Sequence, residues 1–169
     1  MNLKQIIKEA LILEVGGIEN HYSWTGPFEQ GWHDDIGYKF QDKSGANYLV
    51  KFTRFPDDVW EREYTADGKY DETGTGDVYK VLSTITKITI DFINEFNPIL
   101  IRIPHINTQK EVSATFKALK TSSATEIIDR IKNSTNKRAR LNSIYLKGNL
   151  PQGYTYQLKG SDSIIKRNG

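Results

Sequence analysis

The sequence has no cysteine among its 169 residues, and its hydrophobic residues form no long runs. Without thiols, the chain has no disulfide framework, thiolate nucleophile or cysteine-ligated zinc site, and this favours a reducing, intracellular setting. No stretch reaches the roughly 20 apolar residues that span a bilayer. Lys4, Lys8 and Glu9 interrupt the amino-terminal segment where a signal peptide needs an apolar core. We therefore expect a protein that is neither membrane-embedded nor secreted through a usual signal.

The composition is that of a folded chain. Hydrophobic residues make up 37% of the sequence and aromatic residues 11%, which is enough to build a core at this length. We expect one domain over residues 1–160, followed by a flexible basic tail over residues 161–169.

Charge is segregated along the chain. Residues 57–77 hold eight acidic and two basic residues, whereas residues 130–169 hold nine basic residues and one acidic residue. Such polarity suits contact with nucleic acid or with a partner of opposite charge. The alternative is that these charged residues form solvent-exposed faces and bind no partner, so that their separation along the chain has no functional meaning.

The first half of the chain reads as strands. Apolar residues at helical spacing predict a short helix over 2–12, and the breaker-rich segment 20–37 reads as a structured loop. Alternating patterns then predict strands near 37–42, 47–55 and 59–65, which tight turns join into an antiparallel meander.

The second half is mainly helical. Apolar residues every three or four positions predict a long helix over 77–96, and the β-branched run 99–103 predicts a central strand buried on both sides. Helices are expected from Ser123 and again through Tyr145, followed by a last strand over 154–158. The fold class is therefore α/β (α+β), with helices packed against a mixed sheet.

A glycine motif precedes the long helix. Gly74, Thr75 and Gly76 lie between a predicted strand and the helix, where backbone N–H groups can approach an anion such as a pyrophosphate. The other interpretation is a simple tight turn.

The order strand, Gly-x-Gly, helix, strand, helix resembles the GNAT N-acetyltransferase fold. The resemblance implies that Gly74 and Gly76 bind the pyrophosphate of acetyl-coenzyme A. It also implies that Glu61 or Glu63 acts as the base and that Tyr145 protonates the leaving thiolate.

The motif departs from that family in its charge. The family's Gln or Arg position holds Asp71, and Glu72 and Asp77 add further negative charge beside the glycines. Repulsion between these carboxylates and a phosphate opposes coenzyme binding, so we expect no cofactor and lean against an enzyme.

The chain also resembles uncharacterised bacteriophage proteins over roughly residues 38–158. The segments that carry this likeness are YLVKF, TGTGDVYKVLSTITKITIDFI and NKRARLNSIYLKGNLPQGYTY. The likeness implies kinship but brings no established activity, and it suggests a location in the host cytoplasm or in a virion.

Two groups of side chains are candidates for partner binding. Trp24 and Trp32 belong to an aromatic group that either contacts a partner or plugs one end of the meander. Arg138, Arg140 and Lys147 either contact phosphates or form an exposed helix face.

A metal site is not expected. His33, Asp34 and Asp35 are adjacent, and adjacent residues rarely point at one ion.

The leading hypothesis is a phage-encoded, non-catalytic GNAT-like binding protein that is virion-associated or structural, with other phage chains or its own copies as partners. The first alternative is an acetyl-coenzyme A-dependent N-acyltransferase, with acetyl-coenzyme A as cofactor. The second is a nucleic-acid-binding or host-takeover factor that uses the basic carboxy-terminal third. No membrane partner is expected.

Overall fold

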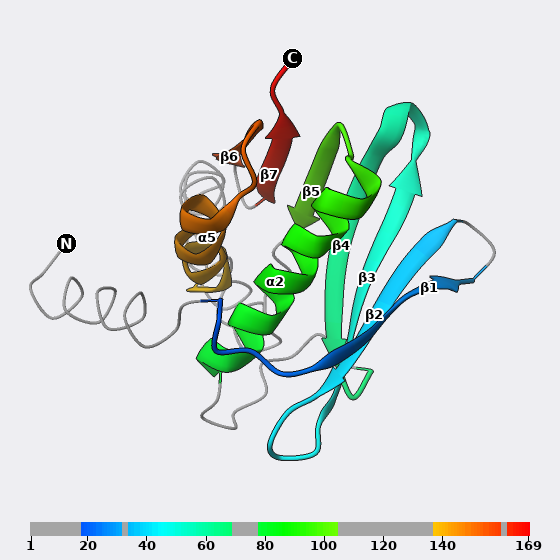
Figure 1. Cartoon of the computed structure of the whole chain (residues 1–169), viewed down its shortest axis with the longest axis vertical. Helices are drawn as coiled ribbons and strands as arrows, with labels where there is room; N and C mark the ends of the chain where they lie inside the picture. Colours follow the sequence, from blue (N-terminus) through cyan, green and yellow to red (C-terminus); the bar gives the residue numbers. More distant parts are fainter. Residues whose placement is uncertain (1–17, 32–33, 69–77, 105–136, 160–161) are drawn as a thin grey trace, which may run out of the picture.

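The computed structural model describes residues 18–31, 34–68, 78–104, 137–159 and 162–169. Seven strands form one mixed sheet in the order β1-β2-β3-β4-β5-β7-β6 (Figure 1). All neighbours are antiparallel except β4 and β5, which are parallel. The α+β class predicted from the sequence is confirmed.

The predicted meander is present. Strands β2 (Asp35–Gln41), β3 (Asn47–Phe55) and β4 (Val59–Ala66) pair antiparallel, and a short 3-10 turn (Pro56–Asp58) joins the last two. Alternation puts Tyr38, Val50 and Phe52 in the core while Lys39 and Lys51 face the other way.

Helix α2 (Val78–Phe96) covers one face of this sheet, as the 3.6-residue period predicts. Its buried side includes Ile85, Ile88 and Phe92, all fully buried. Thr84 and Thr89 do not interrupt the helix, because their hydroxyls donate to the carbonyls of Lys80 and Ile85 at 2.7 Å.

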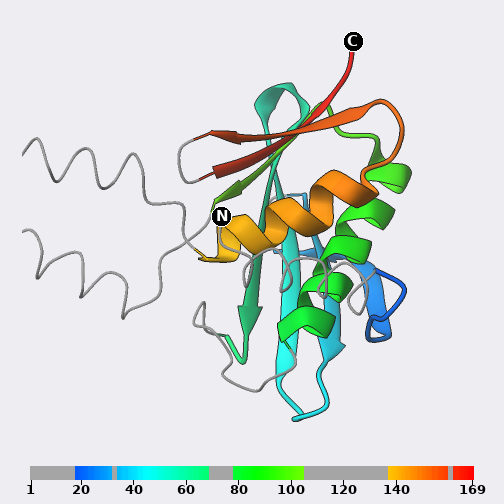
Figure 2. The ribbon, with the colours of Figure 1, turned by 90° about the vertical axis from the view of Figure 1, so that its left-hand side faces the viewer.

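Helix α5 (Lys137–Asn149) packs on the same face beside α2, and Figure 2 shows both helices in front of the strands. We call this the helix-side face. The opposite, outer face carries Lys39, Lys51, Glu61, Glu63 and Arg102, and none of the described helices lies on it. The described elements after β4 run helix, strand, helix and then two strands, where the sequence predicted a single final strand.

Strand β1 (Trp24–Gln30) corrects the expected loop over 20–37. It pairs antiparallel with β2, and the register shifts between Thr25 and Phe28. Gly26 and Pro27 lie at this shift, so the irregularity removes the period of two that marks a strand in a sequence.

Strand β5 (Leu100–Pro104) is central but is not buried on both sides as expected. Ile101 and Ile103 are buried on the helix-side face, whereas the Arg102 side chain is 49% exposed on the outer face. Only one face is buried because the described helices pack on one side alone.

The expected flexible tail is also wrong. Asp162–Arg167 forms β7, which lies between β5 and β6 (Tyr154–Lys159) and pairs antiparallel with both. Ser163 and Ile165 are fully buried in it. Strand β6 agrees with the predicted strand over 154–158, although it is not the last strand.

Three expectations lie outside the described residues: the helix over 2–12, the helix from Ser123, and the glycine motif at Gly74, Thr75 and Gly76. Among the described residues, no helix has the length and apolar character that crossing a membrane requires.

Candidate functional site

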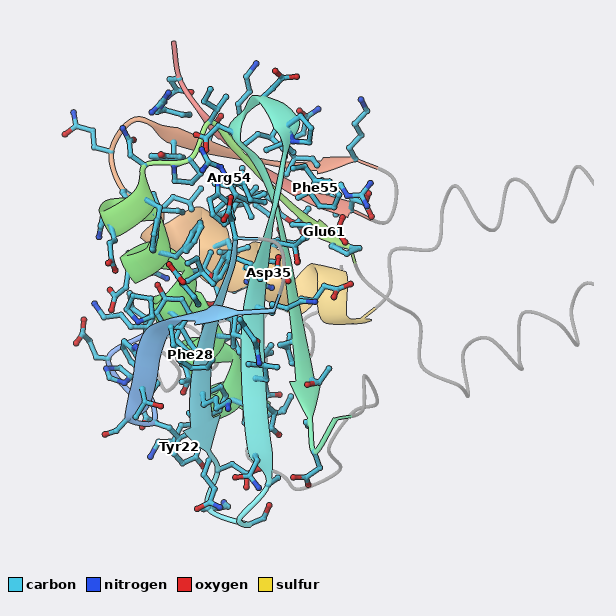
Figure 3. All side chains as sticks on the ribbon, turned by 90° about the vertical axis from the view of Figure 1, so that its right-hand side faces the viewer. Tyr22, Phe28, Asp35, Arg54, Phe55 and Glu61 are labelled. Carbon is cyan, nitrogen blue, oxygen red and sulfur yellow. The ribbon has the colours of Figure 1, made fainter. Side chains whose placement is uncertain are left out.

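The two carboxylates predicted as bases lie on the outer face. Strand alternation buries Trp60 and Arg62 on the helix-side face and turns Glu61 and Glu63 away from the helices. Glu61 accepts hydrogen bonds from Arg102, with the Arg102 Nε at 3.0 Å, and Figure 3 shows it on the open side of the sheet. Arg102 also lies 4.0 Å from Asp162, so Glu61 is part of a charge network across β4, β5 and β7.

The predicted acid, Tyr145, lies on the helix-side face. It is 3% exposed, packs against Leu82 of α2, and its hydroxyl donates to the Tyr79 carbonyl at 3.4 Å. Burial raises the pKa of Tyr145 to about 12, against a smaller opposing effect of a hydrogen bond with Ser83. Glu61 and Glu63 are thus separated from Tyr145 by the sheet itself.

A buried arginine, Arg62, lies on β4 between the two predicted bases and on the opposite face from them. Arg62 is 1% exposed, and its Nη1 donates to Thr89 Oγ1 of α2 at 3.0 Å. Burial lowers the pKa of Arg62 to about 10. The sequence contained the signal for this position, since the alternation of β4 places Arg62 with Trp60 on the side that faces the core.

The predicted partner-binding residues are not gathered into one site. Trp24 on β1 is half-buried, and its ring lies 5.1 Å from that of His21. Lys147 is exposed on α5, with its ammonium 5.5 Å from the centre of the Tyr156 ring. Trp32 and the side chains of Arg138 and Arg140 lie outside the described residues.

No cluster of three or more histidine, aspartate or glutamate side chains that could hold a metal occurs in the part of the chain that the structure describes. His33, the first member of the His-Asp-Asp run, lies outside that part.

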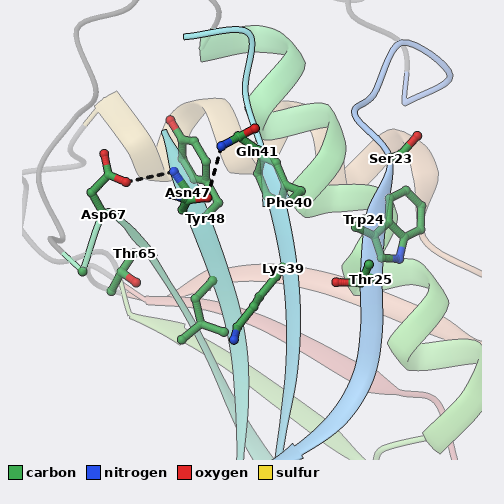
Figure 4. A pocket seen from close by; sticks show the side chains of 12 residues that line it. Ser23, Trp24, Thr25, Lys39, Phe40, Gln41, Asn47, Tyr48, Thr65 and Asp67 are labelled. Carbon is green, nitrogen blue, oxygen red and sulfur yellow. Dashed lines mark hydrogen bonds between the residues drawn. The ribbon is translucent and has the colours of Figure 1, made fainter. Parts of the chain in front are cut away.

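The outer face carries a cavity that the sequence analysis did not find. Its volume is about 780 Å³, and it lies across β1–β4 near the turn between β2 and β3 (Figure 4). The side chains that decide its chemistry are Thr25, Lys39, Gln41, Asn47, Thr65 and Asp67. No sequence motif marks it, because single outward positions of four strands build it.

Comparison with known proteins identifies no relative: no family model, no curated protein and no solved structure matches this chain. The resemblance to the GNAT family and to phage proteins therefore stays a prediction.

Proposed function

We propose that this chain is a non-catalytic binding protein whose partners are other protein chains. The observation that supports this most is the placement of Glu61 and Glu63 on one face of the sheet and of Tyr145 on the other. A base and an acid that serve one reaction must both reach the reacting atoms, within about 3 Å or through one water.

The state of each side chain supports the same reading. The Glu61 carboxylate is already paired with Arg102. The Tyr145 hydroxyl is buried and hydrogen-bonded to the Tyr79 carbonyl, and its raised pKa favours the protonated form. Such a tyrosine stabilises the packing of α5 on α2 rather than meeting a substrate.

The proposal includes the GNAT-like character of the fold and a place in a phage particle, both of which rest on the sequence resemblance. Segregated charge supports protein partners, because copies of the chain can meet with the acidic segment 57–77 against the basic segment 130–169.

The test measures acetyl-coenzyme A binding by calorimetry and acetyl transfer to a panel of amines. We expect no saturable heat at millimolar ligand and no transfer above the rate without protein. Sedimentation of the same sample should show self-association that weakens as salt rises.

If acetyl-coenzyme A binding or acetyl transfer is detected, Gly76→Arg is the test variant and Gly148→Arg is its matched control. Both insert the same side chain, but Gly148 has no atom within 4 Å of an added Cβ and lies far along the chain from the glycine motif. Saturable binding that Gly76→Arg weakens and Gly148→Arg leaves unchanged would replace this proposal with the acyltransferase.

A further inference from the structure

The cavity on the outer face is built from two rows of side chains. Strand register aligns Thr25, Lys39, Leu49 and Thr65 across β1–β4. The next row pairs Gln41 with Asn47, and Asp67 lies beside Asn47, whose backbone N–H donates to Asp67 Oδ1 at 2.9 Å. The site therefore holds a cation in one row and a carboxylate at the end of the other, and Figure 4 shows Lys39 and Asp67 apart.

Lys39 differs from the neighbouring cations of this face. Lys51 lies 4.0 Å from Asp35, and Arg102 is paired with Glu61 and Asp162. Within the described residues, no carboxylate lies within 4.0 Å of Lys39, whose ammonium is 5.0 Å from the centre of the Phe28 ring. No described carboxylate therefore neutralises its ammonium, and the Lys39 side chain contributes to the cavity lining.

The amide pair beside it is oriented by its own hydrogen bonds. Gln41 Nε2 donates to the Gly45 carbonyl at 3.1 Å and to Asn47 Oδ1 at 3.4 Å. This leaves Gln41 Oε1 as an acceptor and Asn47 Nδ2 as a donor. The hydroxyls of Thr25 and Thr65, together with Asp67, add further donors and acceptors around the half-buried Leu49.

We propose that this cavity binds a small polyhydroxylated acid, such as a sugar acid. Lys39 pairs with the carboxylate of the ligand, while Gln41 and Asn47 bond its hydroxyls. A volume of about 780 Å³ lies within the range of small-molecule sites and exceeds what a bare anion fills. This site does not depend on the proposed function, because Glu61, Glu63 and Tyr145, on which that proposal rests, do not line it.

The test titrates ¹⁵N-labelled full-length protein with glucuronate, glucose and acetate and follows backbone amide shifts. Glucuronate carries both a carboxylate and several hydroxyls, glucose lacks the carboxylate, and acetate lacks the hydroxyls. We expect saturable shifts at residues 39, 41, 47 and 65 with glucuronate, and affinity at least about tenfold weaker for either of the others, since one charge-assisted hydrogen bond changes affinity by about that factor.

Lys39→Met should remove the preference for glucuronate over glucose. Lys51→Met is the control, because it removes a half-buried cation from the same face without touching the cavity lining. Equal affinity for glucuronate and glucose, an unchanged preference in Lys39→Met, or no saturable shift at the lining residues would overturn the proposal.

Discussion

Phe92 is the side chain on which the packing of α2 against the sheet depends most. It is fully buried, and its ring lies parallel to that of Phe52 on β3 with centroids 3.8 Å apart. It also meets Trp60 edge-on at 5.0 Å and stacks on Phe96 at 4.8 Å. One residue of the helix therefore joins two strands of the meander.

Phe92→Ala should lower the free energy of unfolding by about 3–5 kcal/mol, the range for removing a buried aromatic ring and leaving a cavity. At about 2–4 °C per kcal/mol for a chain of this length, the melting temperature should fall by roughly 6–20 °C. Because a typical domain is stable by only about 5–15 kcal/mol, the variant should remain folded only at low denaturant.

The assay is urea unfolding followed by tryptophan fluorescence, to which the buried Trp60 contributes, and by circular dichroism. Phe55→Ala is the matched control, since Phe55 is 46% exposed and should cost less than about 1 kcal/mol. If the two variants lose equal stability, or if Phe92→Ala loses under about 1 kcal/mol, the account of the core is wrong.

Two further substitutions test local features. Burial acts to raise the pKa of Asp42, but hydrogen bonds from Ser44, Ala46 and Tyr48 hold it below its usual value, so its charge stabilises the fold above about pH 4 and that contribution is lost as pH falls. Asp42→Asn should therefore be less stable than wild type at pH 7, with a gap that narrows toward pH 2 in urea titrations, and a gap independent of pH would count against this. Gly37→Ala should cost about 1–3 kcal/mol, because the new Cβ would lie 2.7 Å from the Phe28 ring. Thermal melts should show no such loss for Gly148→Ala, where nothing lies within 4 Å, and equal melting temperatures would refute the clash.

Local periodicity was enough to predict the meander and α2. In β2 and β3 the core residues recur at every second position, and in α2 they recur at every third or fourth. These periods follow from backbone geometry, so they are readable wherever one face of an element is buried and the other is not.

Strands β1 and β7 were not predicted from the sequence. A local irregularity interrupts β1, and β7 pairs with a strand that is distant in the sequence. The bulge at Gly26 and Pro27 hides the alternation of β1. Strand β7 carries basic residues at the end of the chain, yet it lies between β5 and β6, and its β5 partners Leu100–Pro104 lie about sixty residues earlier in the sequence. Composition cannot anticipate a strand that is buried only after distant strands provide both neighbours.

At the candidate site, too, part of the arrangement follows from the local sequence and part depends on the tertiary structure. Alternation in the sequence already placed Glu61 and Glu63 together on one face of β4 and Arg62 on the other. Only the tertiary structure decided that α5 packs on the side of Arg62, which separates Tyr145 from both carboxylates. It also decided that side chains of four strands line an open cavity. The reason is physical: the side of a strand is a local property of the backbone, whereas the side that a helix covers depends on which apolar surfaces meet once the whole sheet has formed.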